Sequence, residues 1–233
     1  MPAAKTPDKR KAIVDALMDL ASKRPWNEIE IGDIAQAANV SLAEFRDLFP
    51  SKGAVLGALS RQIDHQVLEG TTEDLAGEPA RERVFDVMMR RFDALAPYKE
   101  ALRRISQDLQ YDLGSLAALN QVALNSQRFM LAAAGISTEG PLGNLKLQGA
   151  VLVYANTMRT WLEDDDPALA RTMARLDREL RRGERILEQA EDVRRLTAPL
   201  RAVGRAFMGS RRPARRDRRR SEDGDIENPA ATI

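Results

Sequence analysis

The segment 30–52, EIGDIAQAANVSLAEFRDLFPSK, constrains the fold of this chain more than any other. Two short stretches with helical apolar spacing flank Asn39, and asparagine tolerates the left-handed conformation that ends a helix. Ser41 and Glu44 match an S-x-x-E capping box, which predicts that a second helix begins there. Three apolar residues then return at helical spacing to a shared core: Phe45, Leu48 and Phe49. The segment therefore predicts a helix-turn-helix, whose second helix can lie in the major groove of DNA.

Apolar spacing of three and four residues continues along most of the chain, and neither an alternating strand pattern nor an internal repeat is present. The chain is therefore predicted to be all-α. Asp8 and Ser51 are expected to cap two of the helices, and Asp166 with Pro167 to begin the last. The expected helices are 8–23, 31–38, 41–48, 52–69, 80–95, 98–110, 114–134, 145–162 and 168–191.

The pattern I-A-x-A-A-N-V-S-x-x-x-F-x-x-x-F-P-S-K, within residues 9–66, resembles the N-terminal domain of TetR-type transcriptional regulators. The resemblance implies a small DNA-binding domain, a larger helical domain for a ligand, and a homodimer formed by helices 145–162 and 168–191. It also implies that helix 41–48 contacts a double-stranded DNA operator. The side chains expected to touch DNA are Ser41, Leu42, Arg46 and Lys52.

We assign three parts to the chain, residues 1–66, 67–193 and 194–233, and charge is distributed unevenly among them. The first part holds nine Lys or Arg and nine Asp or Glu, so the predicted DNA-binding domain is neutral. The second part is acidic, and most of the excess positive charge lies between 194 and 220. A DNA-binding domain is usually basic, whereas in this chain the excess of basic residues lies in the C-terminal tail.

Composition excludes several classes of activity. The chain has no cysteine and one histidine, His65, so thiolate sites and Ser-His-Asp chemistry are not expected. We predict neither an enzyme nor a bound cofactor, and we interpret His65 as a surface residue rather than a pH sensor. The run of acids at 163–166 is interpreted as a cap and a solvated turn rather than a cation site. No signal peptide or membrane span is apparent, which predicts a cytoplasmic protein.

A second resemblance covers residues 80–183. The runs F-D-A-L-A-P-Y-K and T-W-L-E-D-D-D-P-A-L-A-R-T-M-A-x-L-D-R resemble a TetR-fold lipid-binding family that assists ubiquinone biosynthesis. This likeness implies an isoprenoid or other lipid ligand and a vestigial helix-turn-helix. The TetR resemblance implies a groove for a small, apolar ligand among helices 80–134. The second likeness assigns Met88, Leu152 and Trp161 to such a pocket, while the simplest interpretation of Met88 is a core residue and Trp161 is either a core residue or an interface anchor.

The C-terminal tail combines an apolar stripe with a run of arginines. Thr197 is expected to cap a helix that presents Leu200, Val203 and Phe207 on one face. An arginine run follows, including Arg211, Arg212, Arg215 and Arg216. Anionic membrane surfaces and nucleic-acid phosphates both attract such a segment, and a solvated, disordered tail is the simplest interpretation.

Two functions follow. The leading prediction is a dimeric TetR-type transcriptional regulator that binds DNA under the control of a small, apolar ligand. The alternative is a lipid-binding accessory protein of ubiquinone biosynthesis that lies at the membrane surface.

Overall fold

The computed structural model describes the backbone of residues 8–70, 77–109 and 113–209, and the side chains of these residues up to 192 except those at 113 and 115. Every regular element in these ranges is a helix, so the predicted all-α class is confirmed. The elements are α1 (Lys9–Ala21), η1 (Trp26–Glu28), α2 (Ile31–Ala37), α3 (Leu42–Leu48), α4 (Lys52–Glu69), α5 (Ala80–Leu95), η3 (Ala96–Tyr98), α6 (Lys99–Leu109), α7 (Leu113–Ala133), α8 (Gly143–Glu163) and α9 (Ala170–Gly209).

The chain divides into two compact units, residues 1–189 and residues 190–233. Helices α1 to α8 and the first part of α9 belong to the first unit, and the account below concerns that unit. In the second unit the backbone of α9 continues as a helix to Gly209.

The first three helices form the predicted helix-turn-helix with α1 packed across it. α1 is capped by Asp8, whose carboxylate accepts a hydrogen bond from the backbone N–H of Arg10 at 3.0 Å. Its apolar stripe packs with those of α2, α3 and α4 in a small core. Fully buried members of that core are Ile13, Leu17, Ile29, Ile34 and Phe45.

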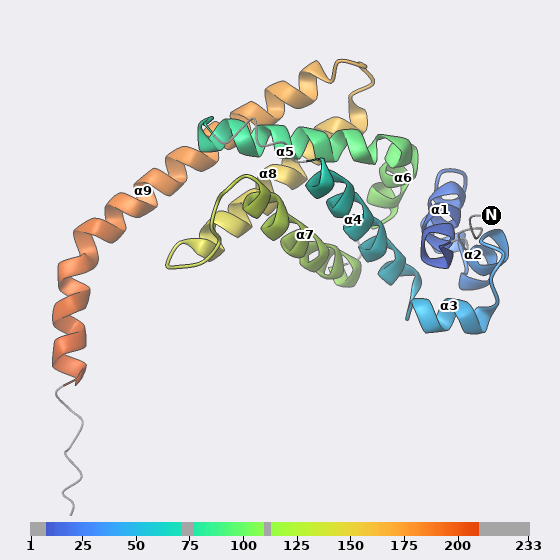
Figure 1. Ribbon diagram of the computed structural model, residues 1–233, viewed down its shortest axis with the longest axis horizontal. Helices are drawn as coiled ribbons and strands as arrows, with labels where there is room; N and C mark the ends of the chain where they lie inside the picture. Colours follow the sequence, from blue (N-terminus) through green and yellow to red (C-terminus); the bar gives the residue numbers. More distant parts are fainter. Residues whose placement is uncertain (1–7, 71–76, 110–112, 210–233) are drawn as a thin grey trace, which may run out of the picture. The chain divides into compact units, whose positions relative to one another are not determined.

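α4 is shared between this small core and the larger body of the unit. It contacts α1 on one side and α5 and α7 on the other, and Figure 1 shows it running from the small helices into the bundle. Its N-cap is Ser51, whose Oγ accepts a hydrogen bond from the N–H of Ala54, as the sequence predicts.

η3 and α6 form a second connection between the two halves of the unit. The backbone N–H of Trp26 in η1 donates to the carboxylate of Asp108 at 2.7 Å, and the hydroxyl of Tyr98 donates to Asp15 of α1 at 3.2 Å. The helix-turn-helix is thus attached to the body through both α4 and α6.

The apolar core continues into the body among α5, α7, α8 and α9. Phe92 of α5 lies against two aromatic residues of α8, with its ring centroid 5.4 Å from that of Tyr154 and 5.5 Å from that of Trp161. Met88, Met130 and Leu176 complete the fully buried set. A large share of the body's stability comes from this apolar burial.

The turn between α8 and α9 differs from the expected one. Asp166 accepts a hydrogen bond from the N–H of Ala168 at 3.0 Å, but α9 begins only at Ala170. The predicted start at 168 is therefore wrong, because Leu169 adopts a left-handed backbone conformation with φ of 50° and delays the helix. The buried carboxylate of Asp164 instead binds the start of α9, accepting from the N–H and hydroxyl of Thr172 at 2.8 and 2.7 Å.

The predicted end of the last helix is also wrong. α9 continues past 191 to Gly209, so Thr197 lies inside a helix and does not cap a new one. Its stretch 171–196 has one helix-weakening residue, Gly183, and no proline. An i,i+4 pair between Asp177 and Arg181 supports the helix, so nothing in the segment ends it at 191.

Candidate nucleic-acid interface

The turn before α3 has a defined geometry. Asn39 has φ of 52°, the left-handed conformation that the sequence predicts. Its N–H donates to the carbonyl of Gln36 at 3.1 Å, and the N–H of Val40 donates to that of Ala35 at 2.9 Å. These two bonds constitute a Schellman motif, which satisfies the last carbonyls of α2 and reverses the chain into α3.

The predicted capping box fixes the start of α3. The hydroxyl of Ser41 accepts from the N–H of Glu44 at 3.2 Å, and the carboxylate of Glu44 accepts from the N–H of Ser41 at 2.8 Å. Ser41 is exposed but its hydroxyl is already used in this cap. The box therefore confirms the fold prediction, while the role of Ser41 toward DNA stays a prediction.

Glu44 has a second partner outside α3. The ammonium group of Lys9, on α1, lies 2.5 Å from its carboxylate. The hydrogen bond that Lys9 donates, together with those from Ser41, lowers the pKa of Glu44 to about 2. The negative charge that α3 carries at this position is therefore paired within the protein.

One face of α3 is free. The exposed residues are Leu42, Ala43, Arg46 and Asp47, at positions i, i+1, i+4 and i+5, which lie on one side of a helix. Leu42 is 61% exposed, while Phe45 on the opposite side is buried in the core. Among the described residues, no hydrogen bond or ion pair occupies the guanidinium group of Arg46. Two predicted contact residues, Leu42 and Arg46, thus lie on the face that a ligand can reach.

Lys52 is placed differently from the other predicted contact residues. Its ammonium group donates to the backbone carbonyls of Trp26 and Ile29, the latter at 2.8 Å, and lies 4.4 Å from the centre of the Trp26 ring. Burial lowers its pKa. In this structure Lys52 ties η1 to the start of α4, so its side chain is not directed to the free face of α3.

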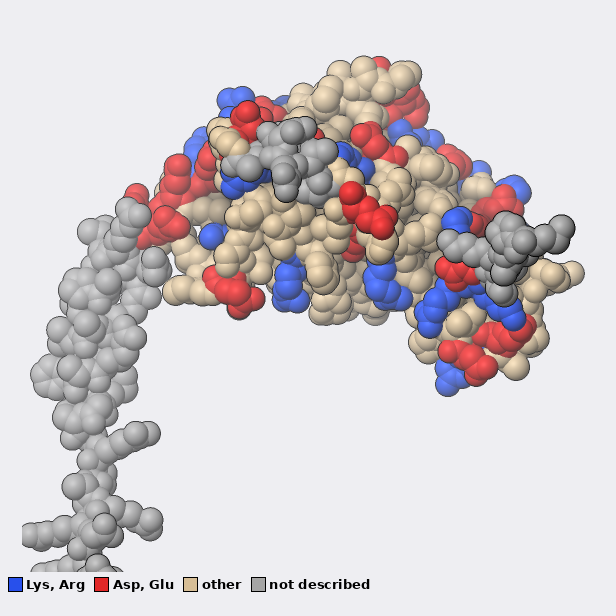
Figure 2. Space-filling view, in the orientation of Figure 1, with Lys and Arg blue, Asp and Glu red and all other residues tan. Residues whose placement is uncertain are grey.

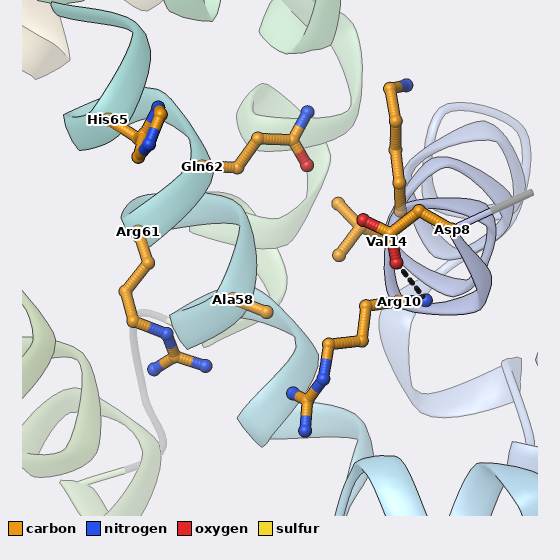
Figure 3. A pocket seen from close by; sticks show the side chains of 8 residues that line it. Asp8, Arg10, Val14, Ala58, Arg61, Gln62 and His65 are labelled. Atoms are coloured by element: carbon orange, nitrogen blue, oxygen red, sulfur yellow. Dashed lines mark hydrogen bonds between the residues drawn. The ribbon is translucent and has the colours of Figure 1, made fainter. Parts of the chain in front are cut away.

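Two arginines that the sequence did not single out lie near α3 and α4. A pocket of about 410 Å³ opens between α1 and α4 (Figure 3). Arg10 and Arg61 flank it, and the guanidinium group of Arg10 also lies 5.4 Å from the ring centre of Phe49, at the end of α3. The other lining residues are Asp8, Lys11, Val14, Ala58, Gln62 and His65. Arg10 and Arg61 are far apart in sequence, so no local motif could have joined them.

The surface of the helix-turn-helix carries both signs of charge. Figure 2 shows acidic and basic side chains interspersed over the lobe that α1 to α3 form, on the face in view. This agrees with the equal numbers of acidic and basic residues in 1–66. Non-specific attraction to phosphate is weak for such a surface.

The three residues assigned to a ligand pocket do not lie together. Met88 and Trp161 are fully buried in the packed core of the body, whereas Leu152 is 61% exposed on the outer side of α8. The sequence showed only that all three are apolar residues on helices. Their assignment to a ligand stays a prediction.

A buried polar cluster lies instead between α4 and the body. Arg91 of α5 donates to Asp64 and, at 3.2 Å, to Ser60, both on α4, and Ser126 of α7 donates to Asp64 at 2.8 Å. The guanidinium group also lies 5.3 Å from the ring centre of Tyr154. Beside Ser126 on α7, the fully buried amide of Gln127 has no hydrogen-bond partner among the described residues.

Three further predictions concern the C-terminal tail, membrane spans and metal sites, and the described residues bear on them only in part. The side chains of Leu200, Val203 and Phe207, and all of residues 210–233 with Arg211, Arg212, Arg215 and Arg216, lie outside the described residues. In the part that is described, no helix is both long and apolar enough to cross a bilayer. Nor do the described acidic and histidine side chains form a group of three that could hold a metal ion.

The acids of the α8–α9 turn have separate structural partners. Asp164 binds the start of α9, and Asp165 forms an ion pair with Arg103 of α6 at 3.1 Å. Arg103 also donates to the carbonyl of Leu162 at 2.7 Å. These contacts fasten the turn to α6.

Comparison with known proteins relates the fold to one family. No model of a protein family and no curated protein matches the sequence. The likeness of residues 80–183 to the ubiquinone-associated lipid-binding family therefore finds no support there and stays a prediction. Solved structures do match. A TetR transcriptional regulator from Nitrosomonas europaea is 23% identical with a TM-score of 0.61, and the match covers 75% of this chain and 97% of that protein.

A TetR transcriptional regulator from Rhodococcus sp. RHA1 gives a similar result, with 18% identity and a TM-score of 0.57. That match covers 75% of this chain and 94% of the Rhodococcus protein. The shared features extend beyond the helix-turn-helix, because three quarters of the chain is aligned in both comparisons. The chain therefore has the fold of the TetR-type transcriptional regulators.

Proposed function

We propose that this protein is a homodimeric transcriptional regulator that binds a double-stranded DNA operator through α3 and responds to a small ligand in its body. The observation that carries the proposal is the free face of α3. Its apolar side is anchored in the core through Phe45, its start is fixed by Ser41 and Glu44, and its opposite side is open. A short helix held in this way is preorganised to enter a major groove.

Phosphate contacts are assigned to two arginines outside α3, on α1 and α4. Arg10 lies beside the end of α3, and Arg61 faces it across the pocket between α1 and α4. Two guanidinium groups in this position suit the phosphates that border a groove. Lys52 would act indirectly, because it holds η1 against the first turn of α4.

The homodimer is assigned to α8 and the first part of α9. The exposed residues of α8 include a stripe at i, i+3, i+7, i+10 and i+14 that holds one charge: Leu145, Gln148, Leu152, Ala155 and Arg159. Gly149 beside it has open space where a side chain would project, so a partner helix could approach closely. A weakly charged helical stripe with an exposed leucine at its centre suits a second copy of the same helix better than water.

The ligand site is assigned to the body among α5, α7 and α8. The aromatic residues Phe92 and Tyr154 supply an apolar surface there, and Arg91 and Gln127 supply polar groups that the fold leaves partly unpaired. A ligand that rearranges this region would also move α4, because Ser60 and Asp64 of α4 are bound to Arg91. α4 in turn contacts the helix-turn-helix, which would couple the ligand to DNA binding.

The test is a genomic DNA pull-down with the purified full-length chain, followed by binding of the enriched sequence to the Arg46→Ala variant. We expect one or a few enriched sites with inverted-repeat symmetry and a loss of affinity of about 10-fold or more in the variant. The matched control is Arg128→Ala, since Arg128 is an exposed arginine on α7. Uniform retention of genomic DNA, or equal affinity of the Arg46→Ala variant for its site, would contradict the proposal.

A further inference from the structure

The free face of α3 has an unusual chemistry for a DNA-reading helix. Its first turn presents two apolar side chains, Leu42 and Ala43, and its second turn presents one cation beside one anion, Arg46 and Asp47. The face has no net charge and one basic group. Its affinity must therefore depend on base edges more than on phosphates.

The apolar half of this face matches one chemical group in the major groove. The C5-methyl of thymine is the apolar feature there, and alanine and larger aliphatic side chains contact it. Leu42 is 61% exposed and projects from the first turn of α3, the end that enters a groove in helix-turn-helix proteins. Burial of its methyl groups against a thymine methyl would remove apolar surface from water on both partners.

The charged half matches a G·C pair. Arginine binds the O6 and N7 atoms of guanine through two parallel hydrogen bonds, and a carboxylate accepts a hydrogen bond from the N4 amino group of cytosine. Arg46 and Asp47 are adjacent and both exposed, so together they offer donors and an acceptor to one pair or to neighbouring pairs. Asp47 also disfavours a position of Arg46 near phosphate, since the backbone would repel the carboxylate.

The Glu44 carboxylate is not available to contact bases. Its carboxylate is held by Lys9 and by the N–H of Ser41, so the single acid of α3 that faces bases is Asp47. The four residues of the free face thus define the reading surface, and the rest of α3 serves to hold it.

We propose that each half-site of the operator combines thymine, read by Leu42 and Ala43 through its methyl group, with a G·C pair read by Arg46 and Asp47. This inference rests on the proposed DNA-binding function and specifies the sequence that the site prefers.

The test begins with selection of binding sequences from a random double-stranded DNA library by the full-length chain. We expect enriched half-sites in which at least one thymine adjoins a guanine. The selected sequence is then synthesised with uracil in place of that thymine, which deletes only the methyl group, and separately with 7-deazaguanine, which deletes the N7 acceptor.

We expect each modified DNA to weaken binding by the wild type more than binding by the variant that lacks the side chain proposed to contact the modified group. Uracil should weaken the wild-type protein by about 4-fold, as loss of one buried methyl group implies, and weaken Leu42→Ala by less, since only Ala43 would still contact the methyl group closely. 7-Deazaguanine should weaken the wild type by about 10-fold and leave Arg46→Ala unchanged. Arg128→Ala should behave as the wild type toward both modified DNAs.

Three results would overturn the inference. Enriched sites without a thymine and guanine in this arrangement would overturn it while leaving the proposed DNA binding intact. The inference would also be overturned, with DNA binding intact, by a combined result: uracil weakens binding by the wild type and by Leu42→Ala equally, and 7-deazaguanine weakens binding by the wild type and by Arg46→Ala equally. Failure to enrich any sequence would count against DNA binding itself, and the inference would fall with it.

Discussion

The carboxylate of Asp64 on α4 accepts hydrogen bonds from Arg91 of α5 and, at 2.8 Å, from Ser126 of α7. Both members of the Asp64–Arg91 ion pair are buried. A buried ion pair gains less than its Coulomb attraction suggests, because both ions lose their water. Removal of one partner is costly all the same, since the other stays behind as an unpaired buried charge.

We therefore expect Arg91→Met to lower the free energy of unfolding by about 3 kcal/mol or more, because it leaves the Asp64 carboxylate buried without its cation. The double variant Asp64→Leu with Arg91→Met should recover much of this loss. Urea unfolding followed by circular dichroism measures both. A double variant no more stable than the single one would show that the buried charge is not the cause.

Glu44 predicts a pH dependence of stability. Its pKa is lowered to about 2 in the folded protein, chiefly by the hydrogen bond from Lys9 and then by those from Ser41, from an ordinary value of 4.5. A lowered pKa means that its stabilising contribution is present above pH 4.5 and is lost as the pH falls toward about 2. Glu44→Gln should therefore be less stable than the wild type at neutral pH, and the two should converge in acid.

The measurement for Glu44 is thermal unfolding at a series of pH values between 7 and the acid range. The control is Glu28→Gln, a change at an exposed carboxylate outside α3. A difference between Glu44→Gln and the wild type that stays constant at all pH values would contradict the assignment.

The stability of the protein should depend strongly on the residue type at position 39. With φ of 52°, valine at this site would be forced into the left-handed region, which costs a branched L-residue about 1–2 kcal/mol. Asn39→Gly should stay close to the wild type, because glycine adopts this conformation freely. Urea unfolding of both variants tests the point, with Asn125→Val on helix α7 as a control that should change stability by a few tenths of a kcal/mol.

Leu152 predicts the location of the dimer interface. Leu152→Glu would place a charge within the exposed stripe of α8 and should weaken self-association by about 2 kcal/mol, or ~30-fold in Kd. Sedimentation equilibrium measures the change. Leu116→Glu, at an exposed leucine of α7, is the matched control and should leave the association unchanged. If both variants stay as dimeric as the wild type, the interface lies elsewhere.

Local signals in the sequence were sufficient for much of the fold. The caps at Asp8, Ser41 and Ser51 and the left-handed turn at Asn39 are all confirmed, since each involves residues within a few positions of one another. The same kind of reasoning misplaced the start of α9. The left-handed backbone of Leu169 is an unfavourable conformation for leucine, and it lies within the turn that the hydrogen bond from Thr172 to Asp164 spans, a contact that no local propensity indicates.

Contacts between residues remote in sequence could not be predicted in this way. Lys52 was assigned to DNA because of its place in the motif, and its two carbonyl partners lie 23 and 26 residues away. Lys9 and Glu44 are 35 residues apart, and so the neutralisation of Glu44 was not foreseen. Arg91 and Asp64 carry no motif at all, because a buried ion pair is visible only once two helices are packed together.

The length of α4 has a mechanical consequence. Lys52 and Asp64 are twelve positions apart on α4, so at a rise of 1.5 Å per residue they lie about 18 Å apart along the helix axis. A tilt of about 5° around Asp64 would displace the Lys52 end by about 1.6 Å, which exceeds the range of about 0.5 Å within which hydrogen-bond lengths vary. In the proposed function, a rearrangement too small to unpack the body would thus be magnified at the Lys52 end of α4 and would misplace the helix-turn-helix relative to the bases.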